Sequence, residues 1–208
     1  KKSKIINTFY YTVENNSSKN SQFVLSDAIY GLRPLKPHPK KNNTKHEEKI
    51  SGFNIESISK FKKNSYIDLI NNKLKPKFIF NHKARYNNER DIEIFKRLPQ
   101  GADSTHSSIK DIMPYKSRGH IFKDKYYKLN SKKVSKTITS HMKFDCNMYI
   151  HPFQARGLSP REAARIQSFP DSFFFTGPSS KVYMQIGNAV PPLLAKQLCL
   201  ALERIIND

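Results

Sequence analysis

The feature that most limits how this chain can fold is the apolar character of its last segment, PPLLAKQLCLALERIIND. Pro191 and Pro192 suit the first turn of a helix, because the N–H that proline lacks has no intrahelical partner there. The polar positions that follow recur at a spacing of seven residues and leave a wide apolar surface; they are Lys196, Gln197, Glu203 and Arg204. Such a helix needs burial on most sides. Since it carries little basic charge, its expected partner is another protein layer and not DNA.

A second segment, RGLSPREAARIQSFPD at 156–171, carries dense signals for one short helix. Ser159 offers an N-cap hydroxyl, Pro160 fits the first turn, and Glu162 can reach back to the N–H of the cap, which together make a capping box. The Phe169-Pro170 pair ends the helix, because the residue before a proline is pushed out of the helical region. A cap of this kind contributes about 1 kcal/mol. The helix at 160–168 is therefore expected to hold other parts in position.

Charge is concentrated in the earlier part of the chain. The 208 residues carry 37 Lys and Arg against 17 Asp and Glu, a formal net charge of +20. Residues 1–155 hold 31 basic and 13 acidic residues, net +18, whereas 156–208 hold 6 and 4, net +2. An excess of this size most often means a polyanionic partner, with nucleic acid the leading candidate, and a lysine-rich solvated surface is the alternative.

Local patterns predict several further elements. Strands are expected at 5–13, 78–82, 135–140 and 148–152, where β-branched and aromatic residues gather. A short helix is expected after Ser26, which would cap it, and a weak helical period runs through 51–75. A clearer helix is expected at 85–101, where Ile92, Phe95 and Leu98 share one face. The proline- and charge-rich stretch 36–50 reads as a flexible loop.

The two cysteines, Cys146 and Cys199, are too few for a disulfide framework and too far apart for a zinc knuckle, so no metal site is expected. No apolar run is long enough for a membrane span, and the start has no signal-peptide pattern. These features favour a reduced, intracellular setting without a membrane. The first residues are Lys-Lys without a methionine, which is compatible with a piece of a longer chain.

Taken together, 156–171 and QIGNAVPPLLAKQL at 185–198 closely resemble the ninth and tenth sequence motifs of bacterial DNA cytosine-5 methyltransferases. The upstream segments 27–35, 81–101 and 127–139, the last followed by Ile-His-Pro, look like those that surround the target recognition domain in that family. The resemblance covers most of the chain and is sharpest from about Asp124 onward.

The resemblance implies an α/β fold. This chain would supply the target recognition (small) lobe of a two-lobed enzyme, plus the C-terminal helix that completes a Rossmann-like catalytic lobe, which is otherwise absent. Residues 1–50 would be a linker from the catalytic lobe with a short helix and a flexible loop. Residues 51–171 would form the DNA target recognition lobe including the ninth motif, and 172–208 the loop and helix of the tenth motif, packing on the catalytic lobe.

The implied reaction flips a cytosine out of double-stranded DNA, attacks C6 with a cysteine thiolate and moves a methyl group from S-adenosylmethionine to C5. The sequence departs from that pattern, because it contains no F-x-G-x-G cofactor loop, no Pro-Cys nucleophile, no Glu-Asn-Val acid and no Q-R-R-x-R block. Neither Cys146 nor Cys199 follows a proline, and both are expected to be small buried hydrophobes.

We therefore expect a C-terminal fragment or a separate subunit of a DNA (cytosine-5-)-methyltransferase, acting in a restriction-modification system in the bacterial cytoplasm. Its partners would be double-stranded DNA and a catalytic part that carries the Pro-Cys and Glu-Asn-Val motifs, without which this chain would be inactive. The alternative is a catalytically inactive, sequence-specific DNA-binding remnant. An RNA-binding protein would fit the composition, but the sequence has no RNP-like aromatic motif.

By resemblance, Asn188 and Val190 of the GNAV sequence would touch S-adenosylmethionine, the cofactor shared with the missing lobe. In the alternative reading, Asn188 only caps the next helix. Arg161 and Arg165 lie four residues apart and are expected to bond backbone carbonyls or carboxylates of the recognition lobe, with surface ion pairs as the alternative. His151 is expected to be either a phosphate or backbone contact or a structural histidine.

Reading of DNA bases is expected from loops within 78–128. Arginine pairs with guanine, and Asn or Gln pairs with adenine, in bidentate contacts; the candidates are Arg85, Asn87, Gln100 and Arg118. Three lysines just beyond these loops are expected to contact phosphates; they are Lys132, Lys133 and Lys136.

Overall fold

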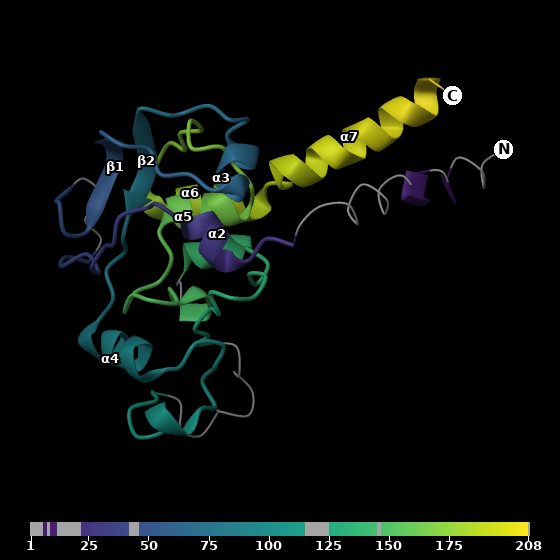
Figure 1. Ribbon diagram of the computed structural model, residues 1–208. Helices are drawn as coiled ribbons and strands as arrows, with labels where there is room; N and C mark the ends of the chain where they lie inside the picture. Colours follow the sequence, from purple (N-terminus) through teal and green to yellow (C-terminus); the bar gives the residue numbers. More distant parts are fainter. Residues whose placement is uncertain are drawn as a thin grey trace.

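The computed structural model describes residues 6–7, 9–11, 22–41, 46–114, 125–144 and 147–207. Its main elements are α2 (Leu25–Ile29), β1 (Gly52–Ser57), α3 (Ser65–Ile70), β2 (Phe78–Lys83), α4 (Glu89–Arg97), α5 (Pro160–Ile166), α6 (Ser179–Asn188) and α7 (Pro192–Asn207). Short 3₁₀ turns lie at η1 (Ser107–Ile109), η3 (Ser140–Lys143) and η4 (Asn147–Tyr149). The fold is thus mixed α/β. In Figure 1, α5 and α6 occupy the centre, the two strands lie on one side, and α4 lies at the end away from α7.

Strands β1 and β2 form an antiparallel pair whose register runs from Gly52 opposite Lys83 to Ser57 opposite Phe78. A two-stranded ribbon is marginally stable by itself, so it needs a packing partner. Asn81 provides one attachment: it has a positive φ of 57° and exchanges hydrogen bonds of 3.0 Å with both backbone groups of Phe175. The ribbon is therefore fixed to the segment between α5 and α6.

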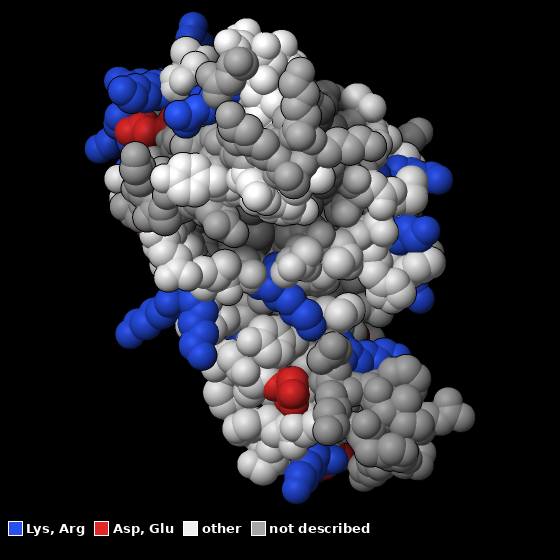
Figure 2. Space-filling view, turned by 90° about the vertical axis from the view of Figure 1, so that its right-hand side faces the viewer, with Lys and Arg blue, Asp and Glu red and all other residues white. Residues whose placement is uncertain are grey.

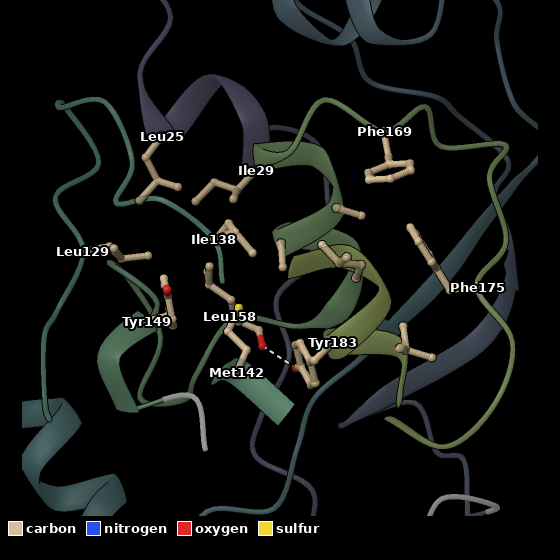
Figure 3. Packing of buried hydrophobic residues seen from close by; sticks show 14 residues of the cluster. Leu25, Ile29, Leu129, Ile138, Met142, Tyr149, Leu158, Phe169, Phe175 and Tyr183 are labelled. Atoms are coloured by element: carbon tan, nitrogen blue, oxygen red, sulfur yellow. Dashed lines mark hydrogen bonds between the residues drawn. The ribbon is translucent and has the colours of Figure 1, made fainter. Parts of the chain in front are cut away.

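The largest buried cluster joins α2, α5 and α6 to the segment that contains η3, and Figure 3 shows its side chains meeting from these elements. Tyr183 of α6 is fully buried there, and its hydroxyl donates to the carbonyl of Leu158 over 2.6 Å. A second cluster joins α4 to η1 and to the Tyr126 and Ile150 side chains. A third lies between α2 and α3, where Leu193 at the start of α7 packs against it.

Helix α7 begins at Pro192, as the sequence predicts, but extends away from the body of the chain (Figure 1). Leu193, Leu198 and Ile205 are half-buried, but four of its large apolar side chains remain exposed by 42–81%; they are Leu194, Leu200, Leu202 and Ile206. The expected burial on most sides is thus not provided by the described residues of this chain. Cys199 is also exposed, so its expected burial is wrong here.

Several sequence-based expectations are confirmed. The strand at 78–82 is β2, the helix within 85–101 is α4, and the capped helix at 160–168 is α5. The helix expected within 51–75 is confirmed only in part. Helix α3 lies in the second half of this range, whereas the first half contains the strand β1. Helix α6 is not among the expected elements, because the segment 172–208 is expected to contain a loop before its one helix.

Other expectations are wrong. The described positions within 5–13 are helical, and 135–140 is irregular before η3 begins. Residues 148–152 form the end of η4 and isolated bridges. β-propensity measures how well a residue fits a paired, half-buried surface, and these stretches have no partner strand among the described residues. Ser26 is not a cap: α2 starts at Leu25, and the N–H groups of Leu25 and Ser26 donate to the carbonyls of Lys133 and Ser131.

Candidate functional site

Helix α5 carries the capping box expected from its sequence. The Ser159 hydroxyl accepts from the N–H of Glu162 over 3.3 Å, and the Glu162 carboxylate accepts from the N–H of Ser159 over 2.7 Å. Six of the helix's residues are buried, and they include the basic Arg161 and Arg165 and the acidic Glu162. This short helix therefore lies at the centre of the fold, where neighbouring segments are attached to it.

Three arginines of 156–171 make these attachments, and none is more than 1% exposed. Arg156 forms two bonds with Glu162, of 2.6 and 2.7 Å. Arg165 pairs with Asp171 over 2.7 and 2.9 Å and donates to the carbonyl of Tyr30 over 2.7 Å. Because these arginines are buried, the alternative that they form surface ion pairs is wrong.

Among the described residues, the hydrogen-bond partners of the Arg161 guanidinium are backbone carbonyls. It donates to the carbonyls of Phe80 over 2.7 Å and Pro170 over 2.9 Å, and also to that of Phe173. Burial lowers the pKa of Arg161 to about 10, although the charge of Asp171 opposes this. The guanidinium remains protonated at neutral pH, so α5, β2 and the segment after α5 are joined through one cation.

The three arginines with Glu162 and Asp171 form a buried network around α5, and two buried histidines complete it. His82 faces the Ser159 hydroxyl with Nδ1 (3.0 Å) and the Arg33 carbonyl with Nε2 (2.9 Å). Because a carbonyl only accepts, Nε2 carries the proton and Nδ1 accepts from the serine. Burial, acting against the attraction of Glu162, lowers the pKa of His82 to about 4.

His151 is likewise a structural residue. Its Nδ1 accepts from the N–H groups of Phe153 and Gln154, and Nε2 lies 3.5 Å from the Glu162 carboxylate. With 2% exposure it cannot reach a phosphate, so the structural alternative holds. Burial lowers its pKa to about 4 as well. Burial would raise the pKa of Glu162, but the Arg156 charge outweighs this and the pKa lies well below the usual range.

The corner between α6 and α7 contains the GNAV sequence, and it is held from the α5 side. The Gln167 amide donates to the carbonyl of Ile186 over 3.2 Å, and the Ser168 hydroxyl accepts from the N–H of Leu193 over 3.0 Å. Ser168 therefore supplies a hydrogen-bond acceptor to the first turn of α7. In the alternative prediction for Asn188, that residue would have capped this helix. Asn188 itself is exposed, and Val190 is 59% exposed.

The other side of this corner packs on the turn η3. A Cβ on Gly187 would lie 2.2 Å from the backbone N of Ser140 and 2.2 Å from the carbonyl carbon of Thr139. Real side chains do not approach backbone so closely, so only glycine permits this contact. The structure brings 139–143 and the GNAV corner together, although they lie far apart in the sequence.

The expected phosphate contacts lie on the surface. Lys132 and Lys133 are exposed in the turn after Leu129, and Lys136 is half-buried with its ammonium 5.3 Å from the centre of the Tyr127 ring. On the face seen in Figure 2, lysine and arginine outnumber acidic residues and border the narrowing between the larger and the smaller part.

The expected base-reading residues differ in their surroundings. Arg85 is half-buried against η3, and the Gln100 amide donates to the Pro152 carbonyl and accepts from Ser131. The Asn87 amide oxygen is buried and accepts no hydrogen bond from the described residues. A bidentate contact with adenine needs that oxygen exposed, so Asn87 would have to rotate. Arg118 lies outside the described residues.

Some residues of the network carry no local sequence signal. Arg156, Asp171 and His82 were not singled out by sequence reasoning, because their partners lie outside helical or strand spacing; Arg156 and Glu162, for example, are six apart across a cap. The backbone role of Gly187 also depends on a segment distant in the sequence. Only three-dimensional contacts identify them.

A sequence model of C-5 cytosine-specific DNA methylases matches residues 9–204, and the chain therefore belongs to this family. It is 35% identical over 133 residues to the type II methyltransferase M.Bpa9945I of Bacillus paralicheniformis, covering 61% of this chain and 30% of that protein. It is 37% identical over 112 residues to the type II methyltransferase M.AgeI of Thalassovita gelatinovora, covering 54% and 25%.

A third relative is the DNA (cytosine-5-)-methyltransferase M.ApeKI of Aeropyrum pernix, 31% identical over 122 residues that cover 59% of this chain and 25% of that protein. The matched part of the chain thus covers less than a third of the length of these curated relatives. A crystal structure described as a prophage-encoded DNA modification methyltransferase (E. coli) superposes with a TM-score of 0.63 at 20% identity, over 91% of this chain and 49% of that one. The fold is shared with that structure.

Within the described residues, no helix is long and apolar enough to cross a membrane. The same part of the chain brings together no group of three or more histidine, cysteine, aspartate or glutamate side chains that could hold a metal ion.

Proposed function

We propose that this chain is the DNA-recognising part of a cytosine-5 methyltransferase of a restriction-modification system, and that it works with a catalytic part that carries the nucleophile. The observation that carries the proposal is the exposed apolar surface of α7, directly after the exposed corner at Asn188 and Val190. An apolar helix of this kind favours a further protein layer, because apolar area left in water costs roughly 25 cal/mol per Å².

The catalytic part is either another region of the same polypeptide or a separate subunit. Residues 51–171 would form the recognition lobe, and α7 would complete the core of the catalytic lobe. Linker residues 1–50 would connect the lobes, with 172–208 returning to the catalytic side. The central network around α5 would keep these regions in a fixed relation.

S-adenosylmethionine would supply the methyl group. Asn188 and Val190 fit a role beside this cofactor, because both are exposed on a corner whose backbone is held by Gln167 and Ser168. Asn188 can offer a polar side chain and Val190 an apolar contact, while the catalytic part would have to provide the rest of the pocket.

DNA binding would rely on phosphate contacts from Lys132, Lys133 and Lys136, and base reading stays a prediction for Asn87, Gln100 and Arg118. If about six phosphates are neutralised, affinity should fall on the order of a thousandfold between 50 and 200 mM salt. Replacing Lys132 and Lys133 by alanine should then lower the salt slope by about two.

The test is reconstitution. The purified chain is mixed with a catalytic part that contains the Pro-Cys and Glu-Asn-Val motifs, and transfer of tritiated methyl groups to DNA is measured. We expect activity in the mixture and none from either part alone. Methyl transfer by the 208 residues alone would refute the division of roles. DNA binding without restored activity would instead favour an inactive DNA-binding remnant.

A further inference from the structure

The side chain of Arg85 holds the 3₁₀ turn η3 by its last carbonyl groups. Nη1 donates to the Met142 carbonyl over 2.7 Å, and Nη2 donates to the carbonyls of Phe144 (3.1 Å) and Lys143 (3.4 Å). The guanidinium also lies over the ring of Tyr183, 5.3 Å from its centre. One cation thus connects the end of β2 to η3 and to α6.

This arrangement suits the end of a helical turn. The last carbonyls of such a turn have no partner within it, and a cation near them is favourable. Arginine is suited to the task because its planar fork presents five donors in fixed directions. Tyr183 gives the fork a rigid support, since its ring is buried and its hydroxyl is bonded to Leu158.

The turn is held from its other end by the contact with Gly187, which lets Thr139 and Ser140 lie against α6. Met142 points into the main core and is fully buried. The backbone of 139–144 is therefore fixed at both ends and in the middle, so the side chains on its outer face are held in a defined position.

The outer face of the turn carries chemistry suited to nucleic acid. His141 and Phe144 are exposed, Phe144 by 64%, and their rings lie 5.2 Å apart. The Lys143 ammonium lies 4.7 Å from the centre of the Phe144 ring. Exposed aromatic rings stack on bases and ammonium groups contact phosphates, and the two together are typical of nucleic-acid surfaces.

We infer that η3 is a DNA-contacting turn whose outer face is His141, Lys143 and Phe144, and that Arg85 is a positioning residue that presents it. Arg85 therefore acts through the turn and does not read a base. The inference rests on the proposed DNA binding of the chain, and it deepens that function by assigning a contact surface outside the loops of 78–128.

The first test measures binding of the purified chain to a fluorescent duplex of about 30 base pairs of mixed sequence at low salt, where phosphate contacts are strongest. Arg85→Ala should weaken binding about tenfold, or ~1.4 kcal/mol. Arg85→Lys keeps the charge but loses the fork, so it should weaken binding nearly as much. Arg204→Ala removes the same charge from α7 and should leave the affinity near that of the wild type.

The second test is a double-mutant cycle. The variant Lys143→Ala with Phe144→Ala changes only the outer face of the turn, and it should lose affinity while keeping the wild-type melting temperature. Adding Arg85→Ala to it should cause little further loss, because coupled residues are not additive. The measurement on the Lys143→Ala, Phe144→Ala variant remains informative even if Arg85→Ala fails to fold.

The outcomes are separable. If the wild-type chain does not bind the duplex, the proposed DNA binding fails and this inference fails with it. If the wild type binds but Arg85→Lys binds equally well, or the turn variant keeps full affinity, only the inference is overturned. Full additivity of Arg85→Ala with the turn variant would likewise show an independent contact of Arg85 with DNA.

Discussion

Arg156 and Glu162 form a two-bond ion pair, of 2.6 and 2.7 Å, in which neither side chain is more than 1% exposed. Removing two charges from water is costly, and the pair is tolerated because both groups make further hydrogen bonds. The carboxylate also accepts from Ser159, and the guanidinium donates to the carbonyl of Gly157. The capping box of α5 is thus part of a buried electrostatic centre, and its energetic weight exceeds that of an ordinary cap.

Glu162→Gln should destabilise the chain by about 3 to 5 kcal/mol, because the buried Arg156 charge loses its counter-charge. Glutamine can still close a capping box, so the loss reports the charge and not the cap. Urea denaturation followed by circular dichroism measures the effect. Glu93→Gln, which breaks the exposed pair with Arg97, is the matched control and should leave the midpoint unchanged. Equal midpoints for the two variants would contradict the prediction.

Acid should destabilise the fold in the range set by His82 and His151. Burial lowers both pKa values from 6.5 to about 4. As pH falls from 6.5 towards 4, the unfolded chain takes up protons that the folded chain does not, so the free energy of unfolding falls. Each histidine contributes a loss on the order of 2 kcal/mol at pH 5 relative to neutral pH. Below about pH 4.5 protonation of Glu162 adds a further loss, because the folded state lowers its pKa.

Unfolding by urea at pH 8, 6 and 5 tests this dependence. The variant His151→Asn keeps an acceptor for the N–H groups of Phe153 and Gln154 but cannot be protonated in this range. It should reduce the fall in stability between pH 8 and 5 by about half. An unchanged pH dependence in this variant would show that His151 does not contribute to acid unfolding.

Sequence reasoning located the features that depend on neighbouring residues. The S-P-x-E cap of α5 and the Pro-Pro start of α7 are local signals, and both helices lie where the sequence predicts. The apolar spacing of α4 and the β-rich stretch of β2 also sufficed. Each of these elements is largely specified within its own residues.

What sequence reasoning missed depends on distant segments. The stretch around Ile138 has the composition of a strand, yet it packs as irregular chain because α6 offers it a helix surface and no strand edge. Gly187 falls in the expected loop of the tenth motif, but it lies in α6, where the absence of a Cβ lets Thr139 approach the helix. Arg85 is predicted from the sequence to read bases, which stays untested, and the carbonyl groups of Met142 and Phe144 that its guanidinium bonds become apparent only in the fold. The site therefore required tertiary contacts that no local pattern encodes.

Gly187→Ala should destabilise the packing of η3 on α6. The added Cβ would meet backbone atoms of Thr139 and Ser140 at 2.2 Å, and backbone cannot move aside as a side-chain end can. We expect a loss of about 1 to 3 kcal/mol or more, even though alanine is the better helix former. Ser180→Ala, at an exposed position of the same helix, is the control and should be neutral or slightly stabilising. A Gly187→Ala variant as stable as the wild type would show that the two segments can separate without cost.

The exposed face of α7 should matter for assembly and not for the stability of the chain alone. Leu202 and Ile206 are 51% and 81% exposed, and glutamine has a helix propensity close to that of leucine, so Leu202→Gln with Ile206→Gln should leave the melting temperature unchanged. Full burial of an exposed side chain of this size contributes about 1.5 to 3 kcal/mol, so burying what remains exposed of these two contributes about 2 to 4 kcal/mol. The double variant should therefore bind the catalytic part at least about thirtyfold more weakly in calorimetric titration. Glu203→Gln, on the polar side of the helix, should bind like the wild type. If the double variant retained full affinity, α7 would not be the contact surface, and the catalytic part would have to dock elsewhere on the chain.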